Sequence, residues 1–170
     1  LGIGAGWNGE EMLNHGTTFS TRFKVMSERA KAIKKLWTEE APEFHGEFVD
    51  FDPVWSYPKP VQDPHPPILI GGESDHTLRR VVEYGDGWFP RARGGFDAAE
   101  NIDRLRKIAE EAGRPMSSLT VSIFGAPPKA AVLDDFAEAG VTRAILALPS
   151  EEREEILPRL DRYTELLQQN

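Results

Sequence analysis

The chain has 170 residues, 39% of them apolar, and its 20 Lys and Arg against 28 Asp and Glu give a formal net charge of −8. That length suits one domain or a large part of one. The acidic balance argues against a nucleic-acid-binding protein, which needs a basic face, and the absence of cysteine excludes disulfides, thiolate zinc sites and cysteine nucleophiles. Because the sequence shows no bilayer-length apolar run, no signal peptide and no ligand-like histidine spacing, we expect a cytoplasmic protein without a metal site.

The N-terminal third of the sequence predicts a strand, a long helix and an insertion. Leu1–Gly4 is typical of the end of a buried strand, and no cap precedes it. Apolar residues then recur every three or four positions, which predicts one face of a helix. These residues are Phe19, Phe23, Met26, Ala30, Ile33 and Trp37. Residues 40–66 hold six prolines and predict a Pro-rich insertion, in which residues 43–52 form a hairpin that turns near His45 and Gly46.

Four further strand–helix units follow the insertion. Short apolar runs predict strands at 67–72, 87–90, 119–124 and 144–148. Apolar residues spaced three or four positions apart follow each strand and predict a helix there, and Gly85, Gly113 and Gly140 end three of these predicted helices. Five strands that are each followed by a helix predict an α/β fold with a parallel sheet. Both a doubly wound sheet and part of a (β/α)8 barrel fit this alternation, since a full barrel needs ~250 residues.

Three segments carry a family resemblance. They are Gly4-Ala5-Gly6-Trp7-Asn8, the run from Pro67 to Ser74, and the run from Tyr84 to Pro90. In this order and spacing they resemble the luciferase-like monooxygenase superfamily, particularly its coenzyme-F420-dependent branch, over essentially all 170 residues. The resemblance implies that residues 1–170 are the C-terminal portion of a single (β/α)8 TIM barrel domain, about strands 4 to 8. It also implies that strands one to three, which supply much of the family's pocket and a His proposed as an acid/base, would lie outside the chain.

Gly71, Gly72, Glu73 and Ser74 join a predicted strand to a predicted helix and form the first candidate site. The first N–H groups of a helix lack internal partners and its dipole favours negative charge, so a phosphate is welcome there. The glycines allow close approach, Ser74 offers a hydroxyl, and the resemblance places the cofactor phosphate at this loop. Since a carboxylate repels phosphate, the Glu73 side chain is expected to point away. The alternative is an ordinary turn in which Ser74 or Asp75 caps the helix.

The loop from Gly4 to Trp7 is the second candidate. Small residues at a strand end leave room for a flat ring, and in the resembling enzymes this loop borders the isoalloxazine or deazaflavin ring. Ala5, Gly6 and Trp7 are therefore predicted cofactor contacts, and Trp7 is also a predicted wall of the substrate pocket. The alternative is a tight turn with Trp7 in the core. Glu10 is predicted to face the cofactor, with a favourable helix-dipole interaction as the alternative.

Arg91 and Arg93 follow a predicted strand, and in a (β/α)8 barrel the C-terminal ends of the strands face the active site. Both are candidates for binding an anionic substrate group or a polyglutamate tail, with solvated loop charge as the alternative. Gly94 and Gly95 would make this loop mobile, as in a lid. His76 is a candidate phosphate contact or a solvent-facing residue.

These observations favour an oxidoreductase that transfers hydride between coenzyme F420 and a small organic substrate, with FMN as the alternative cofactor. F420 is preferred because the Gly4–Asn8 segment looks most like F420-dependent relatives. One alternative is a non-redox barrel enzyme that acts on a phosphorylated metabolite at the same helix end. Another is an inactive barrel fragment with exposed sheet edges. No catalytic residue is identified, and a homodimer is expected from the resemblance.

Overall fold

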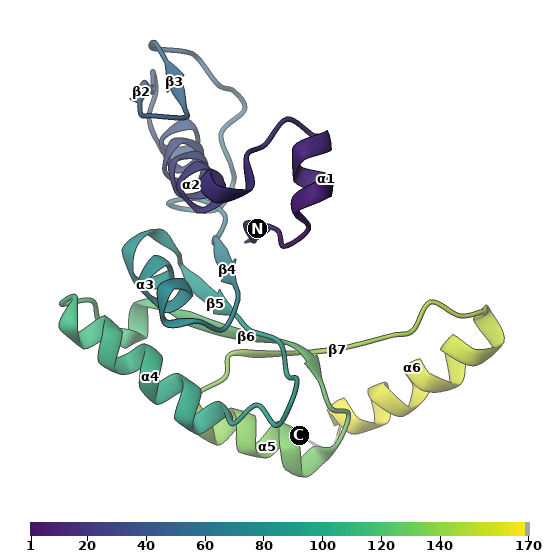
Figure 1. The fold of residues 1–170 in the computed structure, drawn as a ribbon. Helices are drawn as coiled ribbons and strands as arrows, with labels where there is room; N and C mark the ends of the chain where they lie inside the picture. Colours follow the sequence, from purple (N-terminus) through teal and green to yellow (C-terminus); the bar gives the residue numbers. More distant parts are fainter. Residues whose placement is uncertain (169–170) are drawn as a thin grey trace.

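A parallel five-stranded sheet organises the molecule, whose computed structural model describes residues 1–168. The strand order is β1-β4-β5-β6-β7, and all neighbouring pairs are parallel. The bounds are β1 (Gly2–Ile3), β4 (Leu69–Gly71), β5 (Gly87–Phe89), β6 (Thr120–Ala126) and β7 (Arg143–Leu146). Figure 1 shows that the sheet curves.

Each sheet strand is followed by a helix, as the sequence predicted. The helices are α1 (Gly9–Asn14), α2 (Arg22–Thr38), α3 (Asp75–Tyr84), α4 (Ala98–Glu111), α5 (Ala130–Ala139) and α6 (Arg153–Gln168). Short 3-10 helices occupy Phe19–Thr21 and Met116–Ser118, and a separate hairpin is formed by β2 (Phe44–His45) and β3 (Asp50–Phe51). In Figure 1, α3, α4 and α5 cover the same side of the sheet.

The core lies between the sheet and these helices. Ile70 of β4, Trp88 of β5 and Ile123 of β6 are fully buried, and they belong to one cluster with Leu78 of α3 and Leu105 of α4. Burial of each such aliphatic side chain stabilises the fold by about 1.5–3 kcal/mol. The apolar side chains that recur with helical spacing in the sequence therefore form the faces by which α3 and α4 pack on the sheet.

Two local expectations are wrong. The opening run is not a buried strand, because β1 lies at the edge of the described sheet and Leu1 is 52% exposed. The first long helix begins at Arg22, and Phe19, which has the helical spacing, lies in a 3-10 turn before it. The predicted hairpin is confirmed, and its turn begins at Gly46, directly after the pair formed by His45 and Asp50.

The hairpin is attached to α2 through one carboxylate. Glu28 accepts backbone N–H bonds from Glu47 at 3.1 Å, Phe48 at 2.7 Å and Val49 at 2.9 Å. The bond from Phe48 is the main reason that the pKa of Glu28 lies below its ordinary value. An ionised Glu28 therefore holds the turn of the insertion against the helix.

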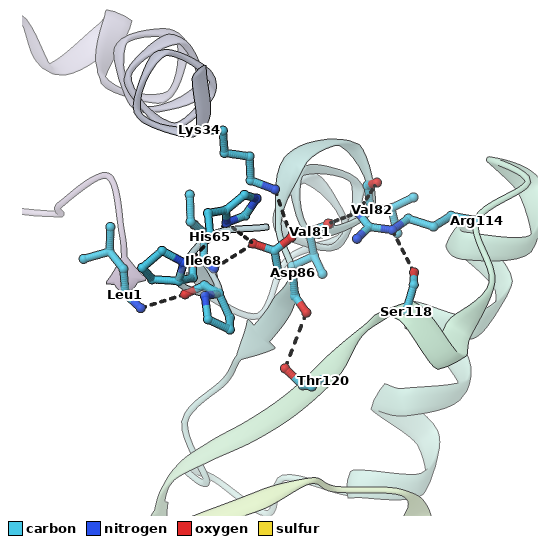
Figure 2. A network of polar contacts seen from close by, with 12 residues as sticks. Leu1, Lys34, His65, Ile68, Val81, Val82, Asp86, Arg114, Ser118 and Thr120 are labelled. Carbon is cyan, nitrogen blue, oxygen red and sulfur yellow. Dashed lines mark hydrogen bonds and ion pairs between the residues drawn. The ribbon is translucent and has the colours of Figure 1, made fainter. Parts of the chain in front are cut away.

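A second polar network ties the strands together at their N-terminal edge (Figure 2). The Asp86 carboxylate accepts the Ile68 N–H at 2.8 Å and pairs with Lys34 Nζ at 2.9 Å. The Asp86 carbonyl accepts the Thr120 N–H at 3.1 Å and the Thr120 hydroxyl, which Figure 2 shows, at 3.4 Å. Asp86 thus links the starts of β4, β5 and β6 to helix α2. In barrel folds this edge serves stability, whereas the opposite edge carries function.

Candidate functional site

The loops predicted to carry function emerge together from the C-terminal edge of the sheet. Ile3 of β1 pairs with Ile70 of β4, and Gly71 of β4 pairs with Phe89 of β5. Because these strands are parallel, the loops that follow them lie side by side. We call the loops formed by residues 4–8, 72–74 and 90–96 the carboxyl rim.

The loop after β4 leads into a capped helix. Gly72 has φ +122°, and a Cβ at this position would lie 2.8 Å from Thr77 Oγ1. Ser74 is the N-cap of α3, and its Oγ accepts the Thr77 N–H at 3.2 Å. Within residues 1–168 no acceptor is recorded for the N–H groups of Asp75 and His76. The start of α3 therefore offers free donors at the positive end of the helix dipole, which fits a phosphate.

The Ser74 hydroxyl caps helix α3, which is the role that the sequence left open as the alternative to phosphate binding. As an N-cap it already receives one N–H, and it lies 3.1 Å from Thr77 Oγ1. A bound anion would consequently be held mainly by backbone N–H groups. Asp75, beside it, is paired with Arg104, and that hydrogen bond is the largest cause of the lowered pKa of Asp75. His76 is exposed in the first turn.

Glu73 and Arg91 join two loops of the carboxyl rim. Arg91 Nε lies 2.9 Å from Glu73 Oε1 and Arg91 Nη2 lies 2.9 Å from Oε2, while the Arg91 backbone N–H also donates to Oε1 at 3.1 Å. The side-chain hydrogen bond from Arg91 is the main cause that lowers the pKa of Glu73, and it raises the pKa of Arg91. Arg91 therefore neutralises the Glu73 carboxylate. The role of Arg91 as a ligand for an anionic substrate group stays a prediction.

Arg93 borders a hollow of about 400 Å³ beside this ion pair. The walls also include Glu73, Arg91 and Phe96. Arg93 is exposed, and its guanidinium forms no ion pair with the part of the chain that the structure describes. Gly94 and Gly95, which line the same hollow, have φ +61° and φ +76°. A cation on a glycine loop thus faces space that an anionic group can enter.

The loop after β1 presents Trp7 to solvent. Its side chain is 87% exposed, so the alternative that Trp7 fills the core is wrong. Gly6 has φ +79°, and a Cβ at Gly4 would meet nothing within 4 Å. Ala5 is half-buried, and Glu10 is exposed in the first turn of α1. Open space next to the backbone and a free aromatic side chain fit the approach of a flat ring.

Sequence reasoning missed the contribution of Trp88. This residue was predicted only as part of a strand, but its buried indole Nε1 donates to the Gly72 carbonyl oxygen at 2.7 Å. The signal was available, because a tryptophan in a buried strand needs an acceptor for its N–H. Within residues 1–168 no cluster of three His, Asp or Glu side chains suitable for a metal ion is found, and no helix is long and apolar enough to cross a membrane.

Comparisons with known proteins identify the family of this chain. Residues 1–168 match the family model described as luciferase-like monooxygenase, and the chain belongs to that family. An uncharacterised protein of Mycobacterium bovis is 32% identical over 163 residues, which are 95% of this chain and 57% of that protein. An FMNH2-dependent dimethylsulfone monooxygenase of Pseudomonas putida is 30% identical over 62% of this chain and 28% of its own length. The chain thus spans little more than half of the mycobacterial relative.

Solved structures show the same fold at low sequence identity. The monooxygenase RslO1 of Streptomyces bottropensis is 18% identical with a TM-score of 0.79, over 99% of this chain and 67% of that one. The coenzyme F420-dependent tetrahydromethanopterin reductase of Methanopyrus kandleri is 14% identical with a TM-score of 0.69, over 98% and 71%. The fold is therefore the part of a luciferase-like (β/α)8 barrel that the sequence predicted, with a hairpin between α2 and β4. The domain limits 1–170 and 40–66 stay predictions.

Proposed function

We propose that the complete protein is an oxidoreductase that binds a flavin or deazaflavin coenzyme on the carboxyl rim and transfers hydride to or from a small organic substrate. The observation that carries this proposal is the parallel pairing of β1 with β4, which sets the Gly4–Asn8 loop beside the Gly72–Ser74 loop. One coenzyme can touch both only if they share an edge. The family match supports the class of chemistry.

The residues of the rim have separable tasks in this proposal. The free N–H groups of Asp75 and His76 would hold the coenzyme phosphate. Gly4, Ala5 and Gly6 would leave room for the ring, and Trp7 would shield one side of it from water. When bound, the coenzyme supplies the hydride chemistry, and the protein supplies binding and orientation.

We propose F420 as the first candidate coenzyme and FMN as the second. Resemblance of the Gly4–Asn8 segment to F420-dependent enzymes supports F420. The name of the Pseudomonas putida relative supports reduced FMN for that protein. Glu10, at the start of α1, is proposed to face the ring, and Arg93 is proposed to meet an anionic group of the substrate or coenzyme. A cytoplasmic location and a homodimer also stay predictions.

Titration of the full-length protein tests the proposal. F420 and FMN are added separately, and coenzyme fluorescence and the ultraviolet–visible spectrum are followed. We expect a saturable change with one of them. We also expect at least tenfold weaker binding of the matched ligand without phosphate, riboflavin for FMN or the phosphate-free deazaflavin for F420, because a charge-assisted hydrogen-bond set is worth about 1.5–3 kcal/mol.

Each negative outcome has its own meaning. No response to either coenzyme overturns the redox assignment, and thermal stabilisation by inorganic phosphate alone would then favour the non-redox alternative. Equal affinity for the ligands with and without phosphate retains the redox assignment but overturns the role of the α3 start.

A further inference from the structure

Trp88 touches both neighbouring loops of the carboxyl rim from inside the core. Its side chain is fully buried, and its Nε1–H donates to the Gly72 carbonyl oxygen at 2.7 Å. On the β5 side, the indole packs beside the Phe96 ring, with 6.0 Å between the ring centroids. Phe96 in turn lines the hollow that Arg93 borders. One buried side chain therefore contacts the loop after β4 and the loop after β5.

The hydrogen bond to Gly72 determines the direction of the next backbone N–H. The peptide bond between Gly72 and Glu73 is trans, since the cis bonds precede Pro58 and Pro64. In a planar trans peptide the C=O and the N–H point in opposite directions. Because Trp88 holds the Gly72 carbonyl toward the core, the Glu73 N–H points away from it. Within residues 1–168 no acceptor is recorded for this N–H.

Gly72 needs an external restraint of this kind. Glycine populates many backbone conformations, so its own preference does not fix a single one. The φ of +122° is rarely adopted by other residues, and the nearby Thr77 leaves no room for a Cβ. The Trp88 bond selects one conformation for a residue that has no side chain with which to do so.

We propose that Trp88 is a positioning residue, which fixes the Gly72 peptide so that the Glu73 N–H joins those of Asp75 and His76 in binding the coenzyme phosphate. The inference rests on the proposed function, because it assumes that an anion is held at this loop. The independent support is that the same indole also packs on Phe96, at the wall of the neighbouring hollow. Trp88 itself touches neither coenzyme nor substrate.

The test removes the N–H donor and leaves the ring in place. In the full-length protein, Trp88 is replaced by 3-benzothienylalanine, in which sulfur stands where the indole has N–H, and separately by Phe (W88F). The matched control is Trp37→Phe, since Trp37 is a partly buried tryptophan that packs against His65 away from the rim. Two quantities are measured: the Kd for the coenzyme that the parent binds, and amide hydrogen exchange over residues 72–76.

We expect the benzothienyl variant to bind the coenzyme about fivefold more weakly than the parent, the size of one net hydrogen bond. Exchange over residues 72–76 should rise, while the control stays within twofold in both readouts. A Kd within twofold of the parent overturns the inference. If the parent binds neither coenzyme, the proposed function fails instead, and unchanged exchange in the benzothienyl variant then separately overturns the role of Trp88. The benzothienyl variant decides the case if W88F does not fold.

Discussion

The Glu73 carboxylate and the Arg91 guanidinium form a bidentate ion pair, in which each of the two side-chain N–O distances is 2.9 Å. The pair connects the loop after β4 with the loop after β5. It also removes a negative charge from the neighbourhood of the α3 start.

Loss of Arg91 should weaken coenzyme binding. In Arg91→Gln, Glu73 keeps its charge without a partner, and repulsion worth roughly 0.7–1.4 kcal/mol should raise the Kd threefold to tenfold. The double variant E73Q/R91Q removes both charges and should return the Kd to within twofold of the parent. Fluorescence titration measures all three proteins. Additive losses in the double variant would contradict the neutralising role.

The same pair should contribute to stability in a defined pH window. The folded-state pKa of Glu73 is lowered, so its contribution is present above the ordinary glutamate pKa of ~4.3 and is lost as the pH falls through the lowered value. Since both side chains are partly exposed, the contribution should be below about 1 kcal/mol. The Tm difference between parent and R91Q should be constant above about pH 5 and shrink in more acidic buffer. A difference that grows on acidification would contradict this assignment.

Substitution of Gly4 should weaken coenzyme binding without lowering the stability of the fold. A Cβ at this position meets no atom within 4 Å, so Gly4→Leu should change the Tm by less than about 2 °C, as expected for a surface substitution. The new side chain would occupy the space proposed for the coenzyme ring, and binding should fall at least tenfold. Gly113→Ala, at a φ of +67° after α4, is the control, with reduced Tm and unchanged coenzyme affinity. Unchanged affinity in Gly4→Leu would place the ring elsewhere.

The Glu28 carboxylate should keep the turn of the hairpin ordered against α2. In Glu28→Gln one acceptor of the three turn N–H groups becomes an amide nitrogen, so hydrogen exchange at Phe48 and Val49 should accelerate. Because the pKa of Glu28 is lowered, the parent should show the same loosening only as the pH falls below the ordinary glutamate value. Glu47→Gln, which removes an exposed pair with Lys24, is the matched control and should leave exchange nearly unchanged. Equal exchange in both variants would refute the anchoring role.

Asp86 should matter for stability and not for binding. Asp86→Asn keeps the shape but places an N–H2 donor against the Ile68 N–H or Lys34, which should cost about 1–3 kcal/mol. Coenzyme Kd should stay within twofold, since Asp86 lies at the edge opposite the carboxyl rim. Urea denaturation measures the loss, with Lys31→Gln, from the exposed pair with Glu83, as the control. A large change in Kd would show that the two edges are coupled.

The elements of the fold were predictable from the sequence because helical stripes and short apolar runs record burial directly. Ile70 and Leu105, for example, are fully buried where the pattern required it. The short apolar run at Leu1 does not by itself distinguish an edge strand from a central one, whereas the expectation that three strands lie outside the chain already implied an exposed edge at β1. The start of α2 was missed because Phe19 has the helical spacing but lies in a tighter turn.

The candidate site was only partly predictable. The glycines and Ser74 carry a local signal, since a turn and a cap depend on neighbours in sequence. The Glu73–Arg91 pair and the Trp88–Gly72 bond join residues 18 and 16 positions apart, and they arise from the pairing of β4 with β5. No local pattern contains that register, so the sequence shows that a buried tryptophan needs an acceptor but does not identify which residue supplies it, and the same holds for the partner of Arg91.

The network around Asp86 bears on which substitutions the chain can tolerate. Asp86 unites the starts of three strands through its carboxylate and its backbone carbonyl, and none of these links involves the loops at the far edge. Substitutions in the loop around Arg93, which could alter the molecules recognised there, would therefore leave these links between the strands in place.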